Sequence, residues 1–224
     1  FAGRLASTLF YECEGRNYAH LAIAGSAAGT DGNEAAEITT ARFRSRPEAR
    51  TLGRWIDTGV ISGADDYQLA AAEGVLNLGP LQIVGEFQSA WVHRNSATDV
   101  SFQGGYVYVA YFLTGEHTPW ERETGQLGRV HPLHNFFWIR EQSDTPPGLG
   151  AWQVAARYSY ADLTDADIMG GIESNFTLGL NWWWSPYSRL QFNYIYGRIK
   201  DHQPVDGFSA GDFHILGTRV CVDF

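Results

Sequence analysis

Hydrophobic and polar residues alternate with a period of two along most of the chain. In the stretch 175–184, large apolar side chains occupy every second position: Phe176, Leu178, Leu180, Trp182 and Trp184. The positions between them are mostly polar or small, although Trp183 also lies on that face. Because successive side chains of a β-strand point to opposite faces of a sheet, the pattern predicts strands with one apolar and one polar face.

The same alternation predicts about ten strands and almost no helix. They lie at 2–10, 18–25, 37–46, 67–78, 81–93, 100–114, 152–160, 175–184, 189–196 and 214–224. Gly79-Pro80 and Ser185-Pro186-Tyr187 predict tight turns, and the long connections lie at 47–66 and 115–150. Most of the strands approach the ~9–11 residues that a tilted strand needs to cross a bilayer. We expect residues 1–224 to form a single all-β, antiparallel β-barrel domain.

Two architectures explain such strands. In a soluble β-sandwich or barrel the apolar faces point inward, whereas in an outer-membrane barrel they face lipid and the polar faces line water. The apolar faces are unusually aromatic, which favours the membrane barrel with interfacial girdles. The predicted girdle residues are Trp152, Trp182, Trp184, Tyr194, Tyr196 and Phe224. The longest apolar run, Tyr106–Leu113, is far shorter than the ~20 residues of a membrane-spanning helix.

The chain stops on Phe224, with Val220 and Val222 at alternate positions before it. A terminal Phe on an amphipathic strand resembles the insertion signal of bacterial outer-membrane barrels. An ordinary edge strand that ends on Phe is the alternative.

Composition excludes several classes of protein. The formal net charge is −9, which argues against a nucleic-acid-binding protein because such proteins carry a basic footprint. Two cysteines support neither a disulfide framework nor a four-ligand metal site. We expect no metal and no cofactor. A lone Asp57-Thr58-Gly59 is similar to the active-site tripeptide of aspartic proteases, but a loop is the better interpretation and we expect no enzyme.

Arginines cluster in one stretch of this acidic chain. Between residues 40 and 54 there are five: Arg42, Arg44, Arg46, Arg50 and Arg54. The only acid there is Glu48, so the local balance is positive. On a strand, Arg42, Arg44 and Arg46 would share one face. If that face met lipid, each arginine would cost ~2–4 kcal/mol near the midplane of the bilayer. We therefore expect this row to line the lumen.

A row of guanidinium groups is suited to conduct anions. Arginine stays charged, and its planar fork matches phosphate oxygens. The alternative is that these arginines pair with lumenal acids such as Glu73 and Glu86 and stiffen the wall. Alternation also places Arg157, Arg189 and Arg219 on the polar side. These three are further lumenal candidates, although salt-bridged wall residues are the commoner case.

The chain resembles the phosphate-selective porins of the O and P type. The matching stretches, in order, are 42–48 (Arg-Phe-Arg-Ser-Arg-Pro-Glu), Asp57-Thr58-Gly59, Gly79-Pro80, Leu113-Thr114-Gly115-Glu116, Gly150-Ala151-Trp152, Arg157-Tyr158-Ser159 and Leu180-Asn181-Trp182. The resemblance implies a sixteen-stranded, homotrimeric outer-membrane barrel that passes phosphate or related anions, of which this chain would be the C-terminal ten strands. It assigns Arg42, Arg44, Arg46 and Arg50 to an arginine ladder. The family's deeper affinity site uses a cluster of lysines, whereas residues 1–224 contain only Lys200, so the cluster either lies in the implied N-terminal part or does not exist in this protein.

Strand parity gives an expected orientation. If Phe224 ends at the periplasm, the turns at 79–80 and 185–187 are periplasmic and the 47–66 connection is extracellular. Segment 115–150 is then periplasmic, and the resemblance implies that such long connections fold into the lumen and narrow it.

The functional hypothesis is a passive outer-membrane porin for phosphate, polyphosphate or other small anions. Its other partners would be outer-membrane lipid and lipopolysaccharide. A closed-lumen barrel with a binding or adhesion role, and a soluble secreted β-protein, are the alternatives.

Overall fold

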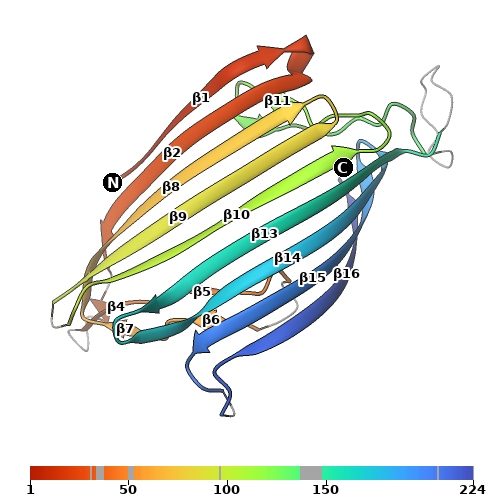
Figure 1. The fold of residues 1–224 in the computed structure, drawn as a ribbon. Helices are drawn as coiled ribbons and strands as arrows, with labels where there is room; N and C mark the ends of the chain where they lie inside the picture. Colours follow the sequence, from red (N-terminus) through yellow and green to blue (C-terminus); the bar gives the residue numbers. More distant parts are fainter. Residues whose placement is uncertain are drawn as a thin grey trace.

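The chain forms one large antiparallel sheet. The computed structural model describes residues 1–30, 32–33, 38–49, 53–95, 97–136, 148–205 and 207–223. Nine long strands pair in chain order, each antiparallel to the next (Figure 1). They are β1 (Ala2–Glu12), β2 (Asn17–Gly29), β8 (Ala64–Leu78), β9 (Leu81–Arg94), β10 (Val100–Phe112), β13 (Ala151–Asp165), β14 (Ile168–Ser185), β15 (Ser188–His202) and β16 (Gly211–Val222). The sheet is open: β1 and β16 are its edges, and neither pairs with a further strand of the described residues.

The remaining elements are short. They are the 3₁₀ turn η1 (Cys13–Gly15), β3 (Gly32–Asn33), β4 (Ile38–Ala41), β5 (Arg44–Ser45), β6 (Ile56–Asp57), β7 (Ile61–Ser62), β11 (Trp120–Glu121) and β12 (Gln126–Leu127). Within the described ranges, no helix is long and apolar enough to cross a membrane.

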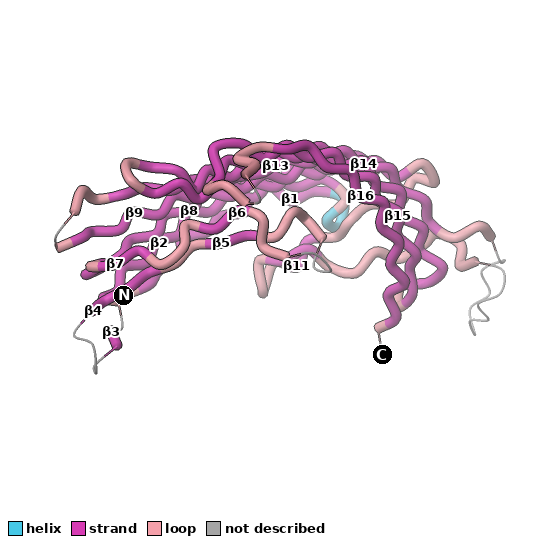
Figure 2. The backbone as a smooth tube through the Cα atoms, turned by 90° about the horizontal axis from the view of Figure 1, so that it is seen from below, coloured by secondary structure: helices cyan, strands magenta, loops and turns pink. Residues whose placement is uncertain are grey.

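The sheet is strongly curved, and its two faces differ in chemistry. Figure 2 shows the long strands arching over β5, β6 and β11, which lie on the concave side. On the convex side, Leu178 lies between Ala156 and Tyr194 in the register and is 48% exposed. The adjacent inward position pairs Gly179 with Asn193, and both line a polar cavity. An exposed apolar outer face opposite a cavity lined by polar side chains is the arrangement expected of an outer-membrane barrel, whereas a soluble barrel turns its apolar faces inward.

The structure confirms the all-β antiparallel fold class but corrects one predicted strand. Residues 37–46 do not cross the sheet, because β2 pairs directly with β8 and the whole stretch 30–63 connects them. The face opposite the arginines offers only Ala41, Phe43 and Ser45, which is too little apolar surface for a lipid-facing strand. Phe43 instead packs inward against Phe102 of β10. Removing this strand reverses the direction expected for β1 and β2.

Both long connections pack apolar side chains onto the concave face, although Phe136 of the second connection lies against Trp182 of the convex face. The 30–63 connection places Ile56 and Ile61 in an apolar cluster with Val92, Phe102 and Ile168 of the wall. The 113–150 connection, at the opposite end, packs Val130 against the wall side chains of Phe112 and Trp183. Each insertion thus buries apolar side chains on the sheet, which holds it inside the curve.

The three predicted girdle tryptophans lie beside one another near the strand ends, whereas Tyr194 and Tyr196 lie in the middle of β15. Trp152 and Trp182 are paired in the register, and their rings stack at a centroid distance of 4.7 Å. The ring of Trp184 lies 5.6 Å from that of Trp182. Tyr194 and Tyr196 are partly exposed on β15. Phe224 lies outside the described residues, so its predicted role is untested.

The convex and concave faces of the sheet lead to opposite expectations for a charge introduced by substitution. Replacing Leu178 by Arg should lower the free energy of unfolding in lipid vesicles by about 2–4 kcal/mol, because the cation would face hydrocarbon. Urea titration of the full-length protein folded into vesicles would measure it. The matched control is Asn193→Arg, which faces the cavity one strand away and should change the stability by less than about 1 kcal/mol. Equal losses in both variants would contradict the assigned faces.

Candidate functional site

The arginine-rich part of the 30–63 insertion is held in shape by Asp57. β5 pairs with β6, with Arg44 opposite Asp57 and Ser45 opposite Ile56. The Arg42 guanidinium donates two hydrogen bonds to the Asp57 carboxylate, from Nε at 2.8 Å and from Nη2 at 2.5 Å. The Gly59 backbone N–H donates to the same carboxylate at 2.9 Å. The Asp-Thr-Gly tripeptide is therefore a structural turn in which the aspartate is engaged by arginine.

The insertion presents arginines on the side that faces away from the wall. Phe43 faces the wall and packs on Phe102, with ring centroids 5.2 Å apart. The neighbouring Arg42 and Arg44 are exposed, as expected for alternate side chains of an extended segment. No carboxylate within the described residues forms an ion pair with Arg44. Asp57, opposite Arg44 in the register, interacts with it through charge without an ion-pair contact, so the positive charge of Arg44 is only partly offset.

Charge and hydrogen bonding reinforce the Arg42–Asp57 pair. The hydrogen bonds from Arg42 hold the pKa of the Asp57 carboxyl below its usual value. The same contact raises the pKa of Arg42. Both groups are consequently charged at any physiological pH. Asp57 forms an ion pair with Arg42 and interacts with Arg44 only through its charge.

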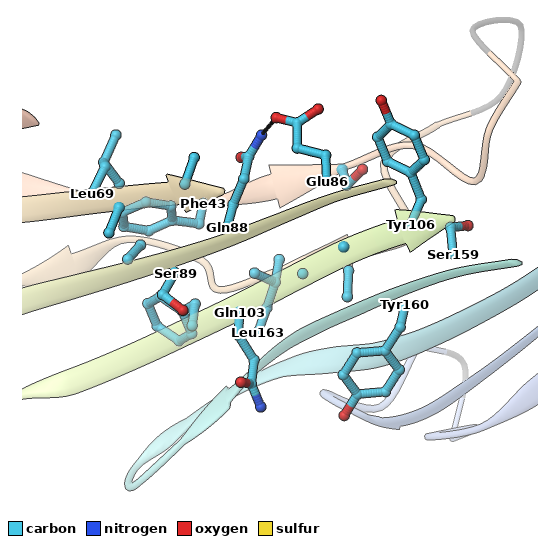
Figure 3. Close-up of a pocket in the computed structure, with 18 of the residues that line it drawn as sticks. Phe43, Leu69, Glu86, Gln88, Ser89, Gln103, Tyr106, Ser159, Tyr160 and Leu163 are labelled. Carbon is cyan, nitrogen blue, oxygen red and sulfur yellow. Dashed lines mark hydrogen bonds between the residues drawn. The ribbon is translucent and has the colours of Figure 1, made fainter. Parts of the chain in front are cut away.

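A cavity of about 940 Å³ separates part of the insertion from the wall. The insertion contributes Phe43, Arg46 and Glu48 to its lining. Figure 3 shows wall side chains from neighbouring strands that project to one side, including Glu86, Gln88 and Tyr106. Gln88 donates a hydrogen bond to Glu86, drawn as a dashed line in Figure 3. This cavity has an apolar floor and a polar rim.

A second cavity, of about 730 Å³, lies toward the other end of the sheet and is more polar. Amide side chains dominate the wall part of its lining: Gln82, Gln153, Asn181, Gln191 and Asn193. Arg129 of the 113–150 insertion and Arg189 of β15 add positive charge. The guanidinium of Arg189 lies 5.8 Å from the ring centroid of Trp183, a cation–π contact.

Glu48 and Arg157 line both cavities and therefore stand at the junction between them. The Glu48 carboxylate lies 3.3 Å from Arg157 Nη1 and accepts a hydrogen bond of 2.6 Å from the Ser159 hydroxyl. Arg157 also lies over the ring of Tyr106, 4.2 Å from its centroid. The tip of the insertion is thus fastened to the inner face of β13.

The predicted site residues divide into three groups. Arg42, Arg44, Arg46 and Arg54 lie on the insertion, not on a wall strand as expected, and Arg50 lies outside the described residues. Arg157 and Arg189 line the cavities. Arg219 pairs in the register with Gln191, which lines the second cavity, but it is exposed near the edge of the sheet.

The structure corrects the predicted acid partners of the arginine row. Glu73 pairs with Arg4 and contacts His20 at 3.1 Å, and Glu86 accepts from Gln88. The carboxylates that meet predicted arginines are Asp57 and Glu48. Asp57 is 15 positions from Arg42, a spacing that a hairpin could have suggested, whereas Glu48 meets Arg157 of a distant strand and no local signal points to that pair.

The 113–150 insertion is anchored to the first two strands. Trp120 stacks on Tyr18 at a centroid distance of 5.5 Å, and its indole N–H donates to the Thr8 hydroxyl at 3.2 Å. The Tyr18 hydroxyl donates to the Thr118 carbonyl at 3.0 Å. The described residues contain no cluster of three His, Cys, Asp or Glu placed to hold a metal ion.

Comparisons with known proteins agree with this arrangement. A family model described as phosphate-selective porin O and P matches residues 2–224. The chain is 28% identical over 188 residues to an uncharacterized protein of Caulobacter vibrioides, covering 82% of this chain and 35% of that protein. It is 22% identical over 158 residues to Porin O of Pseudomonas aeruginosa, covering 66% of this chain and 33% of that protein. The chain thus spans about a third of the length of these relatives.

Replacing Asp57 by Asn should loosen the arginine-bearing hairpin. Hydrogen–deuterium exchange, corrected for intrinsic rates, should be faster in peptides covering 42–59 from pH 5 to 8. Because the pKa of Asp57 is lowered, the Arg42–Asp57 pair contributes its full stabilisation above the usual carboxyl pKa of ~3.9. This stabilisation is lost as the pH falls through the lowered pKa. Wild-type protection should therefore hold steady to pH 5 and fall only below about pH 4.

The control for this experiment is Asp65→Asn, an exposed acid at the start of β8. It should leave exchange of the 42–59 peptides unchanged. Wild-type protection that declines between pH 8 and 6, or equal effects of both variants, would contradict the role of Asp57.

Proposed function

The chain belongs to the phosphate-selective porin O and P family. We therefore propose that it forms part of the wall and part of the constriction of an outer-membrane porin. Its convex apolar face suits hydrocarbon, and its two insertions lie on the concave side, where they narrow a water-filled lumen. The open edges at β1 and β16 would pair with further strands of a sixteen-stranded barrel. The protein is then a passive channel without catalysis, in contact with lipid and lipopolysaccharide and assembled as a homotrimer.

We propose further that the permeant ions are small anions such as phosphate or polyphosphate. The observation that supports this is the exposure of Arg42 and Arg44 on the side of the insertion that faces away from the wall, where only Arg42 forms an ion pair with a described acid. Several moderate cationic sites let an anion enter and leave, whereas one deep site would trap it. Arg46, Arg50 and Arg54 would extend the row, and Arg157, Arg189 and Arg219 would continue it along the wall.

A closed-lumen barrel with a binding or adhesion role is the second candidate, because insertions from both ends occupy the concave face. Single-channel recording of the full-length protein separates the two candidates. Discrete conductance steps would support the porin, and a silent but folded protein would support the closed barrel.

Selectivity should depend on the arginines of the insertion. In planar bilayers, the triple variant Arg42→Ala, Arg44→Ala, Arg46→Ala should lower the anion-to-cation permeability ratio by a factor of roughly ten, because the cations concentrate anions in the lumen. Reversal potentials in a salt gradient measure this ratio.

The control is Arg198→Ala, which removes an arginine on the convex face that is paired with Asp212. It should leave the reversal potential unchanged. An unchanged reversal potential in the triple variant would discard the conduction role of the row.

A further inference from the structure

Glu48 occupies a set of donors that is suited to a free oxyanion. One carboxylate oxygen accepts a hydrogen bond from the Ser159 hydroxyl at 2.6 Å, and the other lies 3.3 Å from the Arg157 guanidinium. A hydroxyl beside a guanidinium is a common way to bind carboxylate and phosphate oxygens. Both donors belong to β13 of the wall, whereas Glu48 belongs to the insertion.

The wall around the bound Glu48 carboxylate has polar groups that form no hydrogen bond with it. Arg157 Nε is buried and has no hydrogen-bond partner within the described residues. The hydroxyl of Thr177, which is paired with Arg157 in the register, is likewise buried and unpartnered. A carboxylate brings two oxygens, but a phosphate brings four. The spare guanidinium N–H and the spare hydroxyl therefore match a larger oxyanion better than the carboxylate now bound.

The backbone of Glu48 adopts an uncommon conformation at the point where its side chain contacts Arg157 and Ser159. Its φ of +56° lies in the left-handed region, which is uncommon for a residue other than glycine. The neighbouring Pro47 is fully buried and fixes the tip of the insertion. Strained backbone of this kind persists where surrounding contacts hold it, and it clusters at ligand clamps and switches.

The position of the site makes it relevant to passage. Glu48 and Arg157 are shared between the linings of the two cavities, so an ion that moves from one cavity to the other passes this pair. With Glu48 bound, the positive charge of Arg157 is offset. With Glu48 displaced or neutralised, Arg157 becomes available to an anion.

We propose that Arg157, Ser159 and Thr177 form an oxyanion-binding subsite, and that Glu48 is a tethered competitor for it. The subsite takes inorganic phosphate or a chemically similar oxyanion, which displaces the carboxylate on its way between the cavities. The inference rests on the proposed anion passage and names a residue that limits it. Because the competitor is covalently linked, its effective concentration is high and it weakens apparent binding without preventing it.

Equilibrium dialysis of inorganic phosphate against the full-length protein tests the proposal independently of conduction. Glu48→Gln keeps the size and the acceptor for Ser159 but removes the charge. It should lower the apparent dissociation constant for phosphate by a factor of roughly five to ten, because a carboxylate no longer competes at the site. Adding Ser159→Ala to this variant should remove most of that gain, because the subsite loses its hydroxyl donor.

The matched control is Glu86→Gln, which removes another cavity-lining acid that contacts Gln88 instead of an arginine. It should change phosphate affinity little. Unchanged affinity in Glu48→Gln, or an equal gain in both single variants, would overturn the tethered competitor. Heat-modifiable migration on gels would verify that each variant has folded.

Bilayer recordings of the same variants separate this inference from the proposed function. A silent wild type would refute anion passage, but tighter phosphate binding by Glu48→Gln would still support the subsite. An anion-selective wild type whose phosphate binding does not respond to Glu48→Gln would retain the function and overturn the subsite.

Discussion

Backbone hydrogen bonding is the constraint on which the rest of this structure depends. In hydrocarbon, each peptide N–H and C=O needs a partner within the protein, so a spanning wall has to be a continuous ladder of paired strands. The antiparallel order from β1 to β16 meets that requirement along the sheet, apart from its two edges and a few local register shifts. Irregular backbone is then tolerated only where it does not meet lipid. This agrees with the packing of the insertions on the concave side through Ile56, Ile61 and Val130, where polar side chains and water can satisfy their peptide groups.

That constraint also explains why each insertion has one apolar side and one polar side. Each needs apolar side chains toward the wall and polar ones toward the interior. Ile56 and Ile61 pack against wall residues, as Phe43 does on Phe102. Extended segments of this kind show the same period-two pattern as wall strands. The Arg-Phe-Arg-Ser-Arg stretch therefore supports either location by alternation alone, and its tertiary contacts decide the matter.

Local signals and long-range contacts differ in how far the sequence reveals them. Side-chain alternation was sufficient to predict the inward face of Trp183, and Gly79-Pro80 was sufficient to predict a tight turn, because both depend on neighbouring residues. The pairing of Ser159 with Glu48 joins residues 111 positions apart, and no local pattern encodes it. The Arg42–Asp57 pair spans 15 positions and depends on a hairpin that begins in a stretch with strand-like periodicity. The wall was therefore predictable, whereas the way the insertion folds back on it was not.

The interior arginines differ in how their charge is offset, and this difference gives the lumen its electrostatic character. Arg42 forms an ion pair with Asp57 on the same hairpin, and Arg157 forms one with Glu48 across a contact between insertion and wall. Arg44 forms no ion pair with a described carboxylate and interacts with Asp57 only through its charge. An interaction of unit charges at 4 Å is worth about 1 kcal/mol in bulk water and about 4 kcal/mol near a protein surface. Binding of that size is strong enough to attract an anion and weak enough to release it. A partner carboxylate on a separate segment can also be exchanged for a mobile anion, whereas one locked in the same hairpin cannot. In the proposed channel, the location of each acid, more than the number of arginines, would therefore determine which cations are available to ions in transit.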